Sequence, residues 1–389
     1  MSDTFATLEE LQQNDGPQAA LEQLARVLTD EANYHRLFDV LLMQKKLELK
    51  LPLVRPTSFD DVPDDDRSGF ETHYVESART VGRLLLEEGR VGDAWVYFHT
   101  IQEPGPVREA LEQVAPGGED YEKTEELINV ALYEGAHPVK GLELMLNSHG
   151  TCNTITALDQ QITQLPPDDR RAAASLLVQQ LYGDLCHTIS AEVTQRLPMI
   201  EPSDNLRELI AGDRDWLFDD NNYHIDVSHL SSVVRFARFL ENDSPDLQKA
   251  LELAEYGQRL DQQFHYPGEV PFGDFYTAHG HFLRALLDDG RDEAVDYFAG
   301  QLEAEPDEED KQLIAYVVVD LLRRIDRVDD AVELAVTHLA HLDDSTGFSF
   351  SELCQSAGRL DLLRDTARSR GDLVTWAGAL IGATDTTSD

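Results

Sequence analysis

The sequence predicts an all-α protein, built as a right-handed array of antiparallel helix pairs. Apolar residues recur at spacings of three and four along nearly the whole chain, as between Leu21 and Leu28. Alternating β-branched runs bounded by turn residues, which would indicate strands, are absent from the sequence. Turn residues such as Gly89, Gly290 and Asp326 separate the periodic stretches, which indicates short connections between paired helices. A generic all-α bundle is the alternative.

The chain is expected to divide into two lobes. Residues 51–70 contain three prolines and an acidic cluster, which is typical of a loop. Residues 196–228 show at most one short helix and then an irregular segment that contains several aromatic residues. The predicted order is therefore a helical pair at 1–50, a linker at 51–70, a helical-repeat lobe at 71–195, an irregular connection at 196–228, a second repeat lobe at 229–382 and a frayed tail at 383–389.

The excess of acidic residues limits the kinds of partner that this protein is expected to bind. The 389 residues contain 32 Lys and Arg but 74 Asp and Glu, which gives a formal net charge of −42. Such a surface repels phosphate backbones and anionic lipids, so we expect neither nucleic-acid nor membrane-surface binding. Hydrophobic residues make up 41% of the chain, which is too many for a disordered protein.

The sequence suggests a cytoplasmic location. The first residues are acidic and lack the basic and apolar regions of a signal peptide. The most apolar stretch, residues 313–322, has about half of the ~20 residues that a membrane span needs. Cys152, Cys186 and Cys354 are odd in number and widely separated, which favours reduced thiols.

Three segments of the sequence align as repeats, namely residues 78–106, 278–306 and 314–340. Each has an apolar first helix, a turn that ends in Arg, and a second helix that begins with Asp or Glu before Ala. These helix–turn–helix units resemble tetratricopeptide repeats, which are about 34 residues long. The residues that carry the resemblance are the Ala, Phe and Pro of the second helix: Ala94, Phe98, Pro106, Ala294, Phe298 and Pro306.

The resemblance covers about a third of the chain and has clear departures. The family's Trp and Tyr positions are unmatched, and the unit at 314–340 has Ala335 where Phe is expected. What the resemblance implies is an α-solenoid, in which Phe98 and Phe298 are buried between helix pairs. It also implies a scaffold that binds a protein or peptide partner on its concave surface, without catalysis.

The segment 219–229 is the first candidate for chemistry. Ser228 is a suitable N-cap for a helix that begins at His229 or Leu230. His224 and Asp226 then lie in the loop and His229 in the first helical turn. Imidazole and carboxylate ligands in one place suit a divalent transition metal such as zinc.

The segment 264–281 is the second candidate, because it adds His265, Glu269, Asp274, His279 and His281. On a helix, His279 and His281 point in different directions, and His279 is the better candidate because apolar residues follow His281. We expect the two segments to pack together, so that the predicted metal ligands are His224, Asp226, His229 and His279. Asp274 could join them, and Asp220 could orient a ligand. The alternative is that these are polar loop residues with ordinary hydrogen-bond partners.

The remaining candidates carry weaker signals. Cys186 and His187 are neighbours in the sequence, but a nucleophile and its base need a spatial arrangement that adjacency does not provide. The Lys45, Lys46 and Lys50 group is expected to be a solvated helix face, or else a contact for an acidic partner. The leading hypothesis is thus a non-catalytic protein-binding scaffold, and a metal-binding protein or metal-dependent enzyme is the alternative. The sequence does not indicate an oligomeric state.

Overall fold

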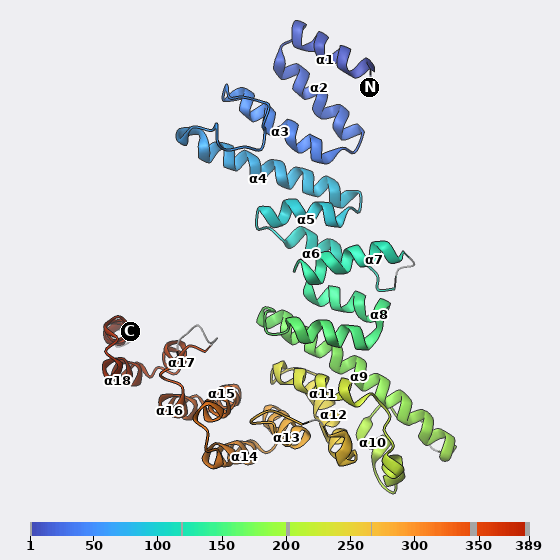
Figure 1. The fold of residues 1–389 in the computed structure, drawn as a ribbon, viewed down its shortest axis with the longest axis vertical. Helices are drawn as coiled ribbons and strands as arrows, with labels where there is room; N and C mark the ends of the chain where they lie inside the picture. The colour runs from blue at the N-terminus through green and yellow to red at the C-terminus, as the bar shows by residue number, and fades with distance from the viewer. Residues whose placement is uncertain (1, 118–119, 200–202, 266, 343–347, 386–389) are drawn as a thin grey trace. The chain divides into compact units, whose positions relative to one another are not determined.

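The computed structural model describes the chain except for residues 1, 118–119, 200–202, 266, 343–347 and 386–389 (Figure 1). Every element in the described part is a helix, and the only β pairing there is an isolated bridge between Pro267 and Asp274. The all-α prediction is confirmed. None of the helices among the described residues is long and apolar enough to cross a membrane. The chain forms two compact units, Met1–Thr154 and Ile155–Asp389.

In the first unit, the six helices between residues 2 and 112 each pack against the next one in the sequence. The elements are α1 (Ser2–Asn14), α2 (Pro17–Asp30), α3 (Tyr34–Glu48), α4 (Asp64–Glu87), α5 (Val91–Thr100), α6 (Gly105–Glu112), α7 (Tyr121–Ile128), a π-helical turn η1 (Asn129–Tyr133) and α8 (Pro138–Gln161). The unit boundary lies within α8, four residues after Gly150, whose positive φ of 79° interrupts the helix. Residues 1–50 thus hold three helices where a pair was predicted.

The predicted loop at 51–70 is shorter than expected, because α4 begins at Asp64. Pro63 has extended backbone angles and ends the loop, and three Asp residues then occupy the first turn, where the helix dipole favours negative charge. Lys46 holds the loop in place: its ammonium donates to the carbonyls of Arg55 and Ser58, each at 2.8 Å, and to the Asp61 carboxylate at 2.7 Å.

Lys46 is therefore not part of a solvated basic face, since its side chain is 0% exposed. A buried ammonium needs this many acceptors, because an unpaired charge in the interior is costly. The hydrogen bond from Lys46 lowers the pKa of Asp61.

The Phe98 ring is buried, as the repeat pattern predicts, but its closest approach is to α4 of its own helix pair rather than to the next pair. It is 1% exposed, and Ala94 on the same face of α5 is fully buried. A Cβ added at Gly82 on α4 would lie 2.6 Å from the Phe98 ring, so only glycine allows this approach of the two helices. Pro106, however, does not simply end a unit: it lies in the first turn of α6, where its missing N–H is harmless.

The second unit also consists of helices that pack mainly against their neighbours in the sequence. Its elements are the end of α8, α9 (Pro167–Arg196), α10 (Leu206–Ile210), η2 (Asp215–Asn221), α11 (Val227–Phe236), η3 (Ala237–Phe239), α12 (Leu247–Arg259), η4 (Gln262–Phe264), α13 (Phe275–Leu286), α14 (Arg291–Ala304), α15 (Glu308–Arg324), α16 (Val328–His338), α17 (Phe350–Ser356), α18 (Leu360–Arg370) and α19 (Leu373–Asp385). The long helix α9 contacts α10, α11, α12 and η3, so the segment 196–228 lies inside this unit. Of the predicted tail, residues 383–385 belong to α19, and 386–389 lie outside the described residues.

In the core of the second unit, small residues lie close to aromatic rings. Phe298 on α14 is fully buried, as is Ala294 one turn earlier. A Cβ added at Gly257 on α12 would lie 2.4 Å from the Tyr276 ring of α13. As at Gly82, a glycine thus lets an aromatic ring pack closely against the neighbouring helix. Pro306 lies between α14 and α15, where Asp307 caps α15 by accepting from the backbone of Glu309 and Asp310.

We expect far-UV circular dichroism of the purified chain to show a helical spectrum with minima of comparable depth at the two helical bands. The physical reason is that helices account for all named elements in the described residues. A fitted strand content above about 10% would contradict this fold, since globular proteins contain roughly 20–25% strand on average.

Candidate functional site

His224 is buried next to α9 and α12 and has a partner at each ring nitrogen. Its backbone N–H donates to the Tyr256 hydroxyl at 2.9 Å, so that hydroxyl donates its own proton to Nδ1 of His224, 3.0 Å away. The opposite nitrogen, Nε2, then carries the proton and donates to the Glu192 carboxylate at 3.1 Å. Burial lowers the pKa of His224, and Glu192 partly opposes this shift. No lone pair of this ring is left for a metal.

Asp226 has a structural task at the start of α11. Its carboxylate accepts hydrogen bonds from the backbone of Ser228 at 2.8 Å and of His229 at 3.2 Å. Asp226 is therefore the N-cap and the helix begins at Val227, where the sequence had suggested Ser228 as the cap. The hydrogen bond from the Ser228 hydroxyl lowers the pKa of Asp226. His229 lies in the first turn of α11, as predicted, and is partly exposed.

His279 lies in the second turn of α13 and is 1% exposed. Its Nδ1 is 2.7 Å from the Phe275 carbonyl, and the ring lies between the rings of Phe272 and Phe275, with both centroids at 4.3 Å. His281 points elsewhere and stacks on Tyr297 at 4.4 Å. The two histidines thus diverge as the helical spacing predicts.

The two predicted segments touch, because the Tyr223 and Phe264 rings meet edge to face at 5.0 Å. They do not bring the four predicted ligands together. In the part of the chain that the structure describes, no group of three or more His, Cys, Asp or Glu side chains is placed to hold a metal ion. His265 also has a partner, since its Nε2 lies 3.0 Å from the Leu260 carbonyl. Four of these polar residues, His224, Asp226, His265 and His279, thus have hydrogen-bond partners within the protein.

Two other histidines, His73 and His187, lie inside long helices. His73 is in the middle of α4, where its Nε2 is 2.9 Å from the Leu41 carbonyl. His187 lies on an exposed face in the interior of α9. Its neighbour Cys186 faces the core, and burial raises the pKa of that thiol to about 11. A thiol with such a pKa is a poor nucleophile at neutral pH.

An arginine cluster in the second unit was not anticipated from the sequence. Four side chains from α9, η3 and α15 line one cavity of about 570 Å³: Arg170, Arg171, Arg238 and Arg324. Positive charge is concentrated here although the chain carries a net charge of −42. Since more than 60 residues separate the α9, η3 and α15 members from one another in the sequence, no local spacing could have indicated the cluster.

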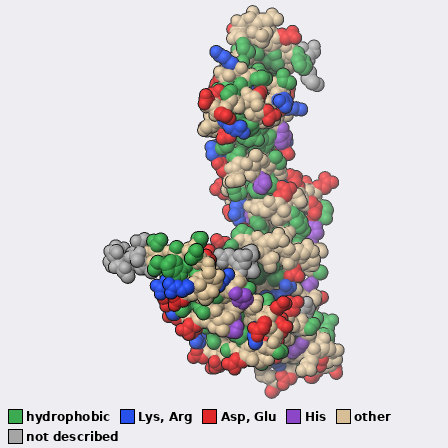
Figure 2. All heavy atoms as spheres, turned by 60° about the vertical axis from the view of Figure 1, so that its left-hand side comes forward, with side chains coloured by type: hydrophobic (Ala, Val, Ile, Leu, Met, Phe, Trp, Pro, Cys, Tyr) green, Lys and Arg blue, Asp and Glu red, His purple; other side chains and the backbone are tan. Residues whose placement is uncertain are grey.

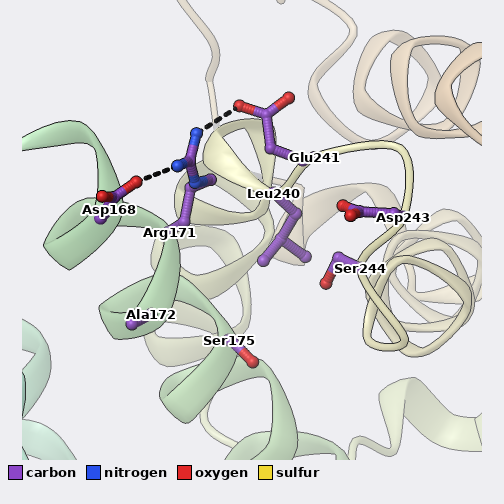
Figure 3. Close-up of a pocket in the computed structure, with 8 residues that line it drawn as sticks. All are labelled: Asp168, Arg171, Ala172, Ser175, Leu240, Glu241, Asp243 and Ser244. Atoms are coloured by element: carbon purple, nitrogen blue, oxygen red, sulfur yellow. Dashed lines mark hydrogen bonds and ion pairs between the residues drawn. The ribbon is translucent and has the colours of Figure 1, made fainter.

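Three of these arginines connect segments of the second unit through hydrogen bonds and ion pairs. Arg171 donates to Glu241 at 2.9 Å and also pairs with Asp168, beside a neighbouring cavity of about 430 Å³ (Figure 3). Arg170 donates to the carbonyls of Thr163 and Leu165, at 3.1 and 3.0 Å.

Arg324 of α15 reaches back to the segment that follows α11. It donates to the Arg238 carbonyl at 2.7 Å and to the Leu240 carbonyl, and it pairs with Asp320 at 3.3 Å. Arg238 is different, because its Nε donates only to the Arg235 carbonyl, at 3.3 Å. Among the described residues it has no carboxylate partner. Burial and the charge of Arg235 lower the pKa of Arg238 to about 10.

A second candidate surface lies on the C-terminal helices, and we call it the α19 surface. It consists of Leu373, Val374 and Leu380 of α19, which are 78%, 84% and 39% exposed, together with Arg368 of α18. Beside them a small cavity of about 190 Å³ is lined by Ala367, Arg368 and Trp376, among others. Figure 2 shows hydrophobic side chains gathered over the C-terminal helices, with basic side chains next to them.

The α19 surface is unusual for this chain in both polarity and charge. The helix from Leu373 to Thr384 contains no charged residue. Arg368 lies over the Trp376 ring at 5.6 Å and forms no ion pair with any residue that the structure describes. Exposed apolar side chains beside an unpaired cation indicate an interaction surface, since apolar patches on soluble proteins are generally small and scattered.

Comparison with known proteins adds no relative. No protein-family model matches the chain, and neither a curated protein nor a solved structure is significantly similar to it.

Proposed function

We propose that this protein is a non-catalytic helical-repeat scaffold that binds a protein or peptide partner. The fold part of the proposal is an array of antiparallel, tetratricopeptide-like helix pairs, arranged in two lobes. Its support is the repeated pairing of a small residue with a buried aromatic ring, at Gly82 with Phe98 and at Gly257 with Tyr276. Arrays of this kind offer long binding surfaces without any catalytic group.

The single observation that carries the binding proposal is the α19 surface. Leu373 and Val374 are more exposed than almost all other large apolar residues of the described chain. Their position in the first turn of α19 places them next to the apolar cavity at Trp376. A hydrophobic side chain of a partner could enter this cavity, because apolar anchors in small pockets supply much of the affinity at protein interfaces.

The charge of the surface points to an acidic, amphipathic partner segment. From Arg359 to Asp372 the chain carries four Arg and three Asp, a local net charge of +1, whereas the whole chain carries −42. A second copy of the chain would bring the same −42 to the contact, so charge repulsion disfavours self-association. A segment with acidic residues on one side and apolar residues on the other matches both Arg368 and the apolar side chains. The concave surface expected from the repeat resemblance stays a prediction.

The test uses a library of random peptides displayed on phage and selected on the purified full-length chain. We expect enriched sequences to combine Asp or Glu with large apolar residues at helical spacing. Synthetic versions should lose at least about tenfold in affinity toward the Leu373→Glu/Val374→Glu variant, as expected when an apolar anchor site gains like charge. This variant should remain folded, because acidic residues in the first turn favour the helix. Leu313→Glu on α15 is the control, since Leu313 is also an exposed leucine, at 54%.

Two results would overturn the proposal. One is a selection in which the double variant enriches the same peptides as the unaltered chain. The other is a wild-type dimer in sedimentation velocity that the double variant dissociates, since this would assign the α19 surface to a second copy.

A further inference from the structure

A separate cavity in the second unit has features that neither the scaffold proposal nor the packing explains. Its volume is about 270 Å³, and it lies between α11, η3, α13 and the loop that precedes α13. Its polar wall consists of Asp159 of α8, Arg235, Arg238, Glu269 and His279, and Phe272 and Phe275 are among its apolar walls. We call it the His279 cavity. It is a different place from the α19 surface, so a ligand bound in it is independent of the proposed scaffold function.

His279 presents a buried acceptor with no donor. The Phe275 carbonyl can only accept, so the Nδ1 atom at 2.7 Å must carry the proton of the neutral imidazole. The lone pair is then on Nε2, and this buried atom has no hydrogen-bond partner among the residues that the structure describes. Burial, assisted by the charge of Arg238, lowers the pKa of His279 to about 3, so the ring is neutral at physiological pH. Leaving such an acceptor unsatisfied costs stability, which makes this atom a place for a ligand's donor.

Arg238 presents a cation that forms no ion pair with any residue that the structure describes. Its guanidinium lies over the Phe272 ring at 4.5 Å, and the same ring stacks with His279 at 4.3 Å. Both groups therefore lie against one phenyl ring, within about 9 Å of each other, and both line the cavity. Arg235 does not neutralise Arg238, because it is itself a cation and is already paired with Asp159 at 2.7 Å.

Glu269, in the loop that precedes α13, adds a carboxylate to the cavity. Its side chain is exposed and lines the cavity, and it forms no ion pair with any described residue. The cavity thus offers one unpaired guanidinium, one unpaired carboxylate and one imidazole acceptor. A simple anion would satisfy Arg238 but would face Glu269, and a simple amine would have the converse problem. A zwitterion, which carries both a negative and a positive group, can pair with all three.

We propose that the His279 cavity binds a small zwitterionic amino acid. The ligand carboxylate accepts from Arg238, and the ligand ammonium donates to Nε2 of His279 and to the Glu269 carboxylate. The apolar walls of Phe272 and Phe275 leave room for a short aliphatic side chain. The size fits, because pockets for drug-sized ligands begin at roughly 300 Å³ and this cavity lies just below that range at about 270 Å³.

The experiment is isothermal titration calorimetry of the full chain with L-valine and two matched analogues. Isovalerate keeps the carboxylate and the side chain but lacks the ammonium group, and isobutylamine lacks the carboxylate. We expect L-valine to bind, and each analogue to bind at least about tenfold more weakly, because each leaves one charged group of the cavity without its partner.

Three variants assign the binding to the cavity. Glu269→Gln and Arg238→Gln should each weaken L-valine binding at least about tenfold by removing one charge. His279→Phe should do the same, while keeping an aromatic ring between Phe272 and Phe275. Glu303→Gln, an exposed change on α14, should leave binding unchanged.

The outcomes of this titration can be told apart from those of the peptide selection that tests the scaffold proposal. Equal binding of L-valine and isovalerate would replace the zwitterion site with a plain carboxylate site and overturn the proposal. So would the absence of any binding heat at millimolar concentrations, since the cavity would then hold water only. Unchanged L-valine binding in Glu269→Gln, which alters an exposed side chain and leaves the core intact, would place the ligand elsewhere.

Discussion

Phe298→Ala is expected to lower the free energy of unfolding by about 3–5 kcal/mol, the range for removing a buried phenyl ring. The Phe298 side chain is fully buried on α14, and its ring lies 5.7 Å from the Phe272 ring. The helices α13 and α15 both pack against α14 and also contact each other, so the backbone cannot collapse easily into the space that the ring leaves. Urea denaturation followed by circular dichroism would measure the change.

Leu313→Ala is the matched control for this prediction. Leu313 lies on α15 and is 54% exposed, so its truncation should change the stability by no more than about 0.5 kcal/mol. A loss below about 1 kcal/mol for Phe298→Ala would show that the ring does not hold the helix pairs together, and the repeat alignment would then be wrong.

The stability of the second unit is expected to fall as the pH decreases from 7 to 4.5, and His279 should account for about 2–3 kcal/mol of that loss. In the folded chain the pKa of His279 is about 3, whereas a histidine in the unfolded chain titrates near 6.5. The folded pKa is the lower one, so the unfolded state binds the proton first. Stability is fully present above pH 6.5 and decreases as the pH falls toward 3.

The charged groups that face His279 act in the same direction. Arg238 and Arg235 both oppose protonation of the ring, and its own backbone partner, the Phe275 carbonyl, only partly compensates. His279→Phe should therefore flatten the stability profile between pH 7 and 4.5 by the same amount, measured by urea denaturation at each pH. His187→Gln on the exposed face of α9 is the control. If wild type and His279→Phe show parallel profiles, the imidazole is not buried in the folded chain.

The fold class could be predicted from the sequence because helical periodicity is a local property. Phe98 and Phe298 were predicted to be buried from the Ala that precedes each of them by four residues, and both are. The ends of the helices were harder to predict, since neighbouring residues can serve equally well as the helix cap. Asp226 and Ser228 are both good N-caps, and the structure uses the carboxylate of Asp226 to accept from two backbone N–H groups. Lys46 was assigned to a solvated face, because nothing local indicates that the following loop folds over it.

The candidate sites could be predicted only in part, because their partners are distant in the sequence. His224 was expected near a metal, yet its ring nitrogens are satisfied by Glu192 and Tyr256, each 32 residues away. His279 was preferred over His281 as a metal ligand, and the structure instead places it in the core, where it is 1% exposed. Its neighbour in the cavity, Arg238, carries no sequence signal at all, since a lone Arg at the end of an amphipathic helix ordinarily faces water.

Most of the packing is between helices that are close in the sequence, and this has a consequence for how the chain folds. Contacts between helices that follow one another require only short loops to close, so the relative contact order is low and the entropic barrier to folding is small. Proteins of this kind fold in microseconds to milliseconds, whereas the ribosome adds only about 5–20 residues per second. Each helix pair can therefore form while the next is still being synthesised, and the newly made apolar faces spend little time exposed to other chains.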